Sequence, residues 1–79
     1  MLTKLAYDTD PAVRWAMADN MRTPVETLDR LGGDASPLVR LRAARNPRLP
    51  AERLAELARD DRSAIREAVA GHPPPRSGL

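Results

Sequence analysis

The apolar positions of this chain recur every 26 residues. A fixed period of about 20 to 50 residues is typical of an array in which each unit buries its apolar face against its neighbours. We therefore expect one helical-repeat domain over residues 1–72, with units 2–27, 28–53 and 54–75. The register sets are Leu2, Leu28 and Leu54; Leu5, Leu31 and Leu57; Val13, Val39 and Ile65; and Ala18, Ala44 and Ala70.

Each unit contains the pattern of two short helices. In residues 50–59, Leu54, Leu57 and Ala58 share one face at helical spacing, and Pro50 marks the start. Residues 24–31 repeat this pattern and are ended by Gly32 and Gly33.

The second helix of each unit follows a turn that contains aspartate. Asp10-Pro11 and Ser36-Pro37 are typical N-cap and N1 pairs. The predicted ranges are 11–19, 37–45 and 63–70, which end at Asn20, Asn46 and His72 because prolines follow the last two. The pattern predicts an all-α fold without strands. The predicted core consists of Leu5, Val13, Met17, Leu28, Leu31, Val39, Ala43, Leu54, Leu57, Ile65 and Val69.

Composition narrows the class of protein. The chain has no cysteine, which excludes disulfides and zinc–thiolate sites. It has no apolar run of about 18 residues and no signal-peptide pattern at its start, so we expect a cytoplasmic protein with no membrane partner. A net charge of +2 indicates a mostly balanced surface. Residues 73–79 carry no helical pattern and are expected to form a flexible, Pro-rich tail.

The unit motif is the most specific feature of the sequence. It appears as Leu31, Asp34, Val39-Arg40, Ala43-Ala44, Asn46-Pro47, Pro50 and Leu54. This pattern resembles the leucine-rich repeat variant family of bacteria, which is similar to HEAT and armadillo arrays. The resemblance implies a short right-handed solenoid in which α-helices alternate with short α or 3₁₀ helices, and no enzymatic activity. The sequence departs from the family's motif at three positions. His72 replaces the Asn, and Gly32 and Gly33 replace an Ala and a variable residue.

Three Asp–Arg pairs share one spacing and form a predicted structural ladder. Each aspartate lies in a turn, and each arginine follows six residues later in the next helix; the pairs are Asp8/Arg14, Asp34/Arg40 and Asp60/Arg66. A guanidinium placed between units can bridge aspartates and turn carbonyls. We expect Arg40 to contact its own Asp34 and a neighbouring turn. A ligand-binding row of arginines is the alternative.

The outward face of the second helices is the predicted protein-binding surface. A helical wheel places Trp15, Leu38 and Leu41 there, with Arg42 and Arg45 at the rim. An exposed aromatic and aliphatic patch edged by arginine is typical of an interface. The other interpretation is that Trp15 covers the edge of the first unit.

Other functions have weaker support in the sequence. A nucleic-acid-binding module would use Arg22, Arg42, Arg45 and Arg48, but no aromatic residues are interleaved with them. A structural segment of a larger assembly and self-association through the exposed repeat ends remain open. His72 is the only histidine, and a helix-capping role fits it better than catalysis. We expect no catalytic residue, no metal and no cofactor.

Overall fold

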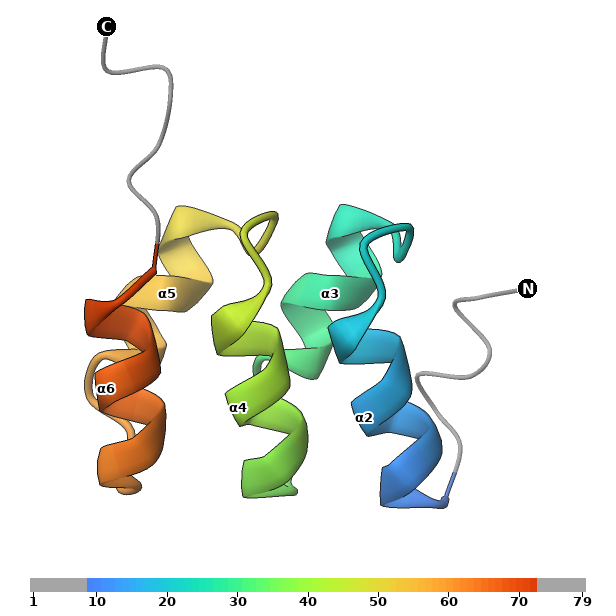
Figure 1. Cartoon of the computed structure of the whole chain (residues 1–79), viewed down its shortest axis with the longest axis horizontal. Helices are drawn as coiled ribbons and strands as arrows, with labels where there is room; N and C mark the ends of the chain where they lie inside the picture. Colours follow the sequence, from blue (N-terminus) through green and yellow to red (C-terminus); the bar gives the residue numbers. More distant parts are fainter. Residues whose placement is uncertain (1–8, 73–79) are drawn as a thin grey trace, which may run out of the picture.

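The computed structural model describes residues 9–72, and this part of the chain is all-α, with five short helices and no strand. The all-α prediction is confirmed for these residues. Leu5, Asp8 and the expected 73–79 tail lie outside them. In chain order (Figure 1) the helices are α2 Pro11–Asp19, α3 Val25–Leu31, α4 Pro37–Arg45, α5 Ala51–Leu57 and α6 Ser63–Ala70.

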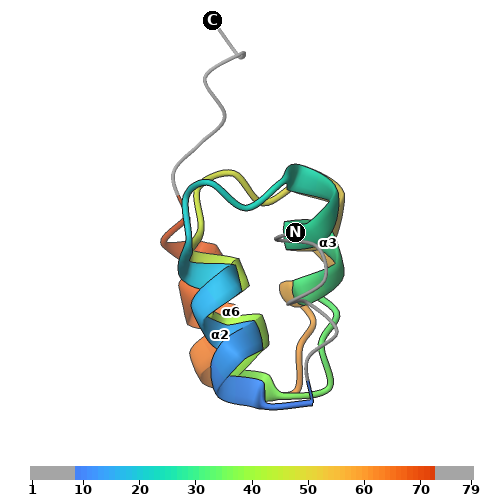
Figure 2. The same ribbon diagram turned by 90° about the vertical axis from the view of Figure 1, so that its right-hand side faces the viewer.

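The helices form two layers. Helices α2, α4 and α6 lie side by side in a row and run in the same direction, while α3 and α5 form the second layer behind them (Figure 1). Figure 2 shows the two layers edge-on, joined by the turns at each end. Helix α4 is the middle of the row and packs on α2 along one flank and on α6 along the other. Its side chains are therefore covered from three directions.

The bounds of α2, α4 and α6 match the predicted ranges. Asp10 caps α2, since its Oδ1 accepts a hydrogen bond from the Ala12 N–H at 2.9 Å. The predicted capping by Ser36 is wrong in its detail, because the Ser36 side chain makes no capping hydrogen bond. Instead Asp34 Oδ1 accepts from the Ser36 N–H at 2.9 Å. The turn aspartate thus fixes the entry to α4 from outside the helix.

Helices α3 and α5 are the shorter ones, with seven residues each. Pro24 and Pro50 are their N-caps, one residue before the helices begin. Helix α5 ends at Leu57, before the predicted limit of residue 59. Gly32 ends α3 where Arg53 packs closely, because a Cβ at Gly32 would lie 2.5 Å from Arg53 Cγ. Any larger residue at this position would therefore require the Arg53 side chain to move.

The core lies between the two layers. Seven predicted core residues are buried: Met17, Leu28, Leu31, Val39, Ala43, Leu57 and Ile65. Ala18, Ala44 and Leu49 join them, together with the polar residues Thr23, Thr27 and Asn46. Val13, Leu54 and Val69 are only half-buried, contrary to the prediction. Val13 belongs to the first described helix of the row, and the other two belong to the last described helices of their layers, so fewer of the described helices pack on them.

Candidate protein-binding surface

Arginine–aspartate ion pairs connect consecutive helices of the row. Arg14 Nε donates to Asp34 Oδ2 at 2.7 Å and its Nη2 donates to Oδ1 at 3.1 Å. Arg40 makes the same pair with Asp60, at 2.8 and 3.3 Å. Each carboxylate lies 20 residues beyond its arginine. Asp34 lies in the turn after α3, and Asp60 lies in the turn after α5. We call these two pairs the Arg–Asp ladder.

Arg40 and its register counterpart Arg66 each also donate to a backbone carbonyl of their own unit. Arg40 Nη1 donates to the Asp34 carbonyl at 2.9 Å and to the Ala35 carbonyl at 3.2 Å. Arg66 Nη1 donates to the Asp60 carbonyl at 2.6 Å. Arg40 therefore contacts both its own Asp34, through the main chain, and the neighbouring turn. Asp8 lies outside the described residues.

The ladder lowers the pKa of both aspartates. Burial alone would raise the pKa of Asp34, but hydrogen bonds from Arg14 and from the Ser36 N–H, with the arginine charges, outweigh it. Burial would also raise the pKa of Asp60, but hydrogen bonds from Arg40 and from the Arg62 N–H, with the arginine charges, outweigh it. The pKa of Asp60 is therefore lowered as well. Both carboxylates are thus ionised in the folded chain below the pH at which they protonate in the unfolded chain.

Acid should therefore destabilise the fold through these two groups. Their ordinary pKa is 3.8, and the folded values are lower. The stabilisation is complete above 3.8 and is lost as the pH falls through the folded-state values, because the unfolded chain binds protons first. We expect melting temperatures measured between about pH 6 and pH 2 to fall most steeply below about 3.8. Asp34→Asn should flatten this dependence.

Asp61→Asn is the matched control for that measurement. Asp61 is exposed and makes no ion pair with the described residues, so its loss changes the net charge alone. If the melting temperature of the Asp34→Asn variant fell as steeply with pH as that of the parent chain, the ladder would contribute no pH-dependent stability.

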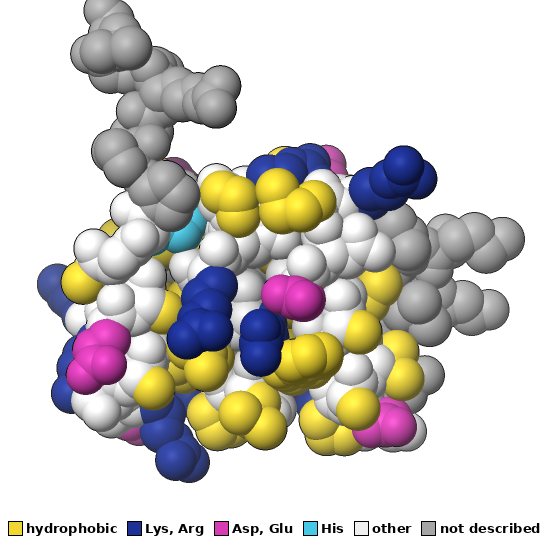
Figure 3. Space-filling view, in the orientation of Figure 1, with side chains coloured by type: hydrophobic (Ala, Val, Ile, Leu, Met, Phe, Trp, Pro, Cys, Tyr) yellow, Lys and Arg dark blue, Asp and Glu magenta, His cyan; other side chains and the backbone are white. Residues whose placement is uncertain are grey.

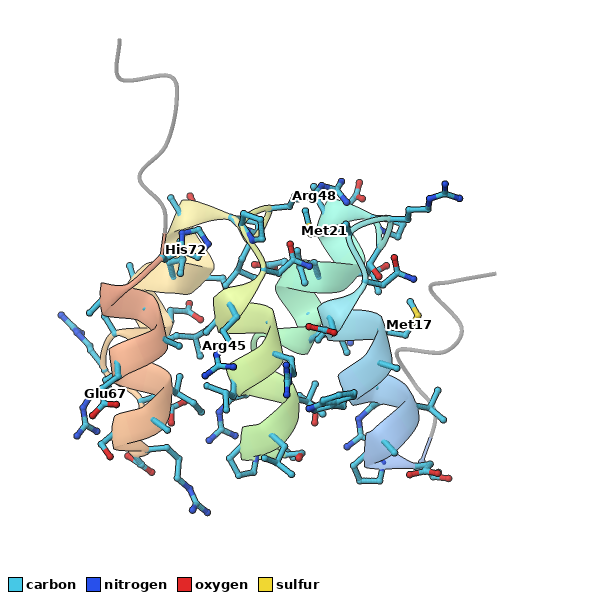
Figure 4. All side chains as sticks on the ribbon, in the orientation of Figure 1. Met17, Met21, Arg45, Arg48, Glu67 and His72 are labelled. Carbon is cyan, nitrogen blue, oxygen red and sulfur yellow. The ribbon has the colours of Figure 1, made fainter. Side chains whose placement is uncertain are left out.

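A second set of polar contacts joins the turns that follow α2, α4 and α6, at the C-terminal ends of these helices. The Asn46 amide is buried and donates to the carbonyls of Ala18 at 3.0 Å and Asn20 at 3.4 Å. The His72 ring lies 2.9 Å from the Asn46 carbonyl, the same contact 26 residues later. His72 thus occupies the position that Asn46 has in the preceding unit. In Figure 4 it lies at the turn that follows α6.

The outward face of α2 and α4 carries an apolar hollow. Its lining residues are Pro11, Ala12, Trp15 and Leu38, and its volume is about 240 Å³. Leu38 is 63% exposed, the largest exposed fraction among the large hydrophobic side chains of residues 9–72. Figure 3 shows hydrophobic side chains over α2 and α4, with basic side chains beside them.

Arg42 lies beside the hollow, over the Trp15 ring. Its guanidinium carbon lies 4.4 Å from the centre of the Trp15 ring, a cation–π contact. Its Nη1 lies 3.7 Å from Asp19 Oδ1, a weak ion pair. Trp15 is half-buried and packs against the core. Trp15 therefore contacts the core and Arg42 of α4, and it also lines the hollow.

The other two predicted surface residues lie apart from the hollow. Arg45 is exposed on α4 and points outward in Figure 4. Leu41 is half-buried and packs against the core. Leu41 is the register counterpart of Trp15, which lies on the flank of α2 that faces α4. Leu41 accordingly lies on the flank of α4 that faces α6. The structure therefore brings together Trp15, Leu38 and Arg42, but not Leu41.

Pro11 is the lining residue that the sequence analysis missed. It was interpreted only as the first residue of a helix, yet its ring lines the hollow. Its spacing of four residues from Trp15 is the signal that could have found it, because residues four apart share one face of a helix. Asp19, four residues after Trp15, was missed in the same way as a partner for Arg42.

Comparison of the chain with models of protein families, with curated proteins and with solved structures found no match. Within residues 9–72 no helix has both the length and the apolar character needed to cross a membrane. The same residues contain no group of three or more His, Cys, Asp or Glu that could hold a metal ion. The surface just described is therefore interpreted from its own geometry.

Proposed function

We propose that this chain is a non-enzymatic helical-repeat scaffold of the leucine-rich repeat variant type, a right-handed solenoid of three 26-residue units. Its role is to bind another protein or a peptide on the outward face of α2 and α4. Repetition of the contacts supports the architecture, since the Arg14–Asp34 pair recurs 26 residues later as Arg40–Asp60. Arrays of this kind bind partners on surfaces formed by adjacent units.

The exposure of Leu38 beside the apolar hollow is the observation that carries this proposal. A hollow of about 240 Å³ is large enough for one apolar side chain, and Trp15 offers it part of an aromatic ring. Interface centres are enriched in such aromatic anchors, and arginines commonly surround them. Arg42, which lies over the Trp15 ring, places a positive charge beside the hollow. The binding partner we propose is therefore a segment with one large apolar residue and acidic residues near it.

The contacts of the arginines favour a protein over a nucleic acid. Of the four candidate arginines, Arg48 is held by the Met21 and Thr23 carbonyls at 2.6 and 2.7 Å. In Figure 4, Arg48 and Met21 lie close together, in the turns that follow α4 and α2. Arg42 is held by Trp15 and Asp19. Arg22 and Arg45 remain, and two phosphate contacts would supply little of the electrostatic affinity on which nucleic-acid binding depends.

Selection from a displayed peptide library tests the proposal. We expect selected peptides to combine a large apolar residue with Asp or Glu and to change the fluorescence of Trp15, the only tryptophan of the chain. Leu38→Asp should weaken binding about tenfold or more, because it places a carboxylate where the apolar anchor docks.

Ala64→Asp is the matched control, since Ala64 is the exposed register counterpart of Leu38 on α6. It should leave binding unchanged. Peptides that bind equally well to the Leu38→Asp variant, or that leave the Trp15 emission unaltered, would exclude the hollow as the binding site.

A further inference from the structure

Arg42 differs from the other half-buried arginines in the part of the chain that the structure describes. The others each donate to a carboxylate at 3.3 Å or less; they are Arg14, Arg40 and Arg53. Arg42 makes no such hydrogen bond, because its buried Nε has no acceptor and its Nη1 lies 3.7 Å from Asp19 Oδ1. That separation exceeds the usual length of an N–H···O hydrogen bond, so the two groups interact by charge alone. The donors at the tip of Arg42 therefore remain available to an acceptor that the described residues do not supply.

Two residues of α2 set the position of Arg42. Its guanidinium carbon lies 4.4 Å from the centre of the Trp15 ring, and Asp19 follows Trp15 by about one helical turn. The Asp19 side chain is 54% exposed and the Arg42 side chain is 31% exposed, so water reaches both charges. An ion pair of this kind contributes little free energy, because water and salt screen it. A second carboxylate can therefore replace Asp19 at low cost.

We propose that Arg42 selects the acidic residue of a docked peptide, and that Asp19 competes with that residue for Arg42. The inference rests on the proposed function, since it takes the apolar hollow as the site of the peptide's apolar anchor. Trp15 lines the hollow and also contacts Arg42, so an anchor in the hollow lies close to a carboxylate held by Arg42. The peptide carboxylate accepts hydrogen bonds that Asp19 is too distant to accept. Asp19 thereby lowers the affinity of the site for acidic peptides.

The carboxylate comes from a side chain of the peptide and not from its C-terminus. Sites for a terminal carboxylate use a group of free backbone N–H donors. Arg42 and Asp19 lie in the last turns of α4 and α2, where the backbone N–H groups are used within the helices. An arginine side chain without such backbone donors is suited to the carboxylate of Asp or Glu.

Calorimetric titration with two peptides, both amidated at the C-terminus, tests the inference. The first is the tightest-binding peptide of the library selection that depends on Leu38, and the second is the same peptide with each Asp or Glu replaced by Asn or Gln. Asp19→Asn should bind the acidic peptide about threefold more tightly than the parent chain does, the scale of one exposed ion pair, and the neutral peptide equally well. Arg42→Gln should bind the acidic peptide about tenfold more weakly than the parent does, and no better than the neutral one.

Glu67→Gln is the matched control for Asp19→Asn, because it changes the net charge by the same amount. Glu67 is exposed and belongs to α6 (Figure 4), a helix that does not line the hollow. This variant should bind both peptides nearly as the parent chain does. Circular dichroism checks that all the variants fold.

The contrary outcomes separate this inference from the proposed function. If Asp19→Asn gave no gain, or a gain that Glu67→Gln or the neutral peptide shared, competition by Asp19 would be overturned. An Arg42→Gln variant that still preferred the acidic peptide would overturn selection by Arg42. Either result leaves the hollow as the binding site as long as Leu38→Asp weakens binding. Peptides that bind the Leu38→Asp variant as well as the parent would overturn the proposed function, and this inference with it.

Discussion

Arg40→Ala is expected to lower the free energy of unfolding by about 2 kcal/mol, a large share for so small a chain. The substitution removes two hydrogen bonds to the Asp60 carboxylate and two to turn carbonyls. It also leaves the carboxylate, whose side chain is 9% exposed, without the Arg40 cation. Removing one partner of a mostly buried pair costs more than the pair itself contributes, because the remaining charge stays desolvated. Chemical denaturation followed by circular dichroism measures the change.

Arg66→Ala is the matched control for that substitution. Arg66 occupies the same register position but makes one hydrogen bond, to the Asp60 carbonyl, and is exposed. We expect it to cost less than about 1 kcal/mol, the usual contribution of one exposed hydrogen bond. Equal losses for the two variants would show that the carboxylate contact of Arg40 adds nothing.

Local patterns in the sequence predict the helices well. The spacing of apolar residues predicts α2, α4 and α6, and prolines and aspartates act on the adjacent backbone to set where these helices begin. The bounds of α3 and α5, the first helix of each unit, are predicted less accurately, because proline is compatible with both the N-cap and the N1 position. Pro50 alone therefore cannot decide where α5 begins.

Contacts between units are harder to predict, because sequence spacing does not give their direction. The six-residue spacing of Asp34 and Arg40 brings them together, but the ion pair that forms is between Arg40 and Asp60. Which aspartate pairs with Arg40 depends on which carboxylate the adjacent turn places beside the guanidinium when the helices pack. The burial of Asn46 has the same origin, since its acceptors lie on the Ala18 and Asn20 main chain.

The outward face shows the limit of a helical wheel. A wheel gives the direction of each side chain but not the width of the buried sector. Leu38 and Leu41 lie about 60° apart on it, at 100° per residue, and were placed on one face. In the structure α4 lies between α2 and α6, so its buried sector is wide enough to include Leu41. Of these two leucines, only Leu38 is exposed.

Leu41→Asp is therefore expected to destabilise the chain by about 3 kcal/mol and to unfold much of it. Leu41 packs against the core, as do Ala68 and Val69 of α6. A carboxylate there would be partly desolvated, and an exposed pair with Arg45, one turn later on the same helix, would offset little of that cost. The melting temperature and the helical circular dichroism signal should both fall.

Leu38→Asp, the same substitution on the same helix, should leave both signals nearly unchanged. Leu38 is 63% exposed, so a carboxylate at that position stays hydrated. The pair of variants thus separates stability from binding: Leu41 affects the fold, and Leu38 affects the docking of a partner. A Leu41→Asp variant that melts with the parent would return Leu41 to the binding surface and extend that surface toward α6. If Leu38→Asp unfolded the chain instead, the apolar hollow would have to be regarded as part of the core.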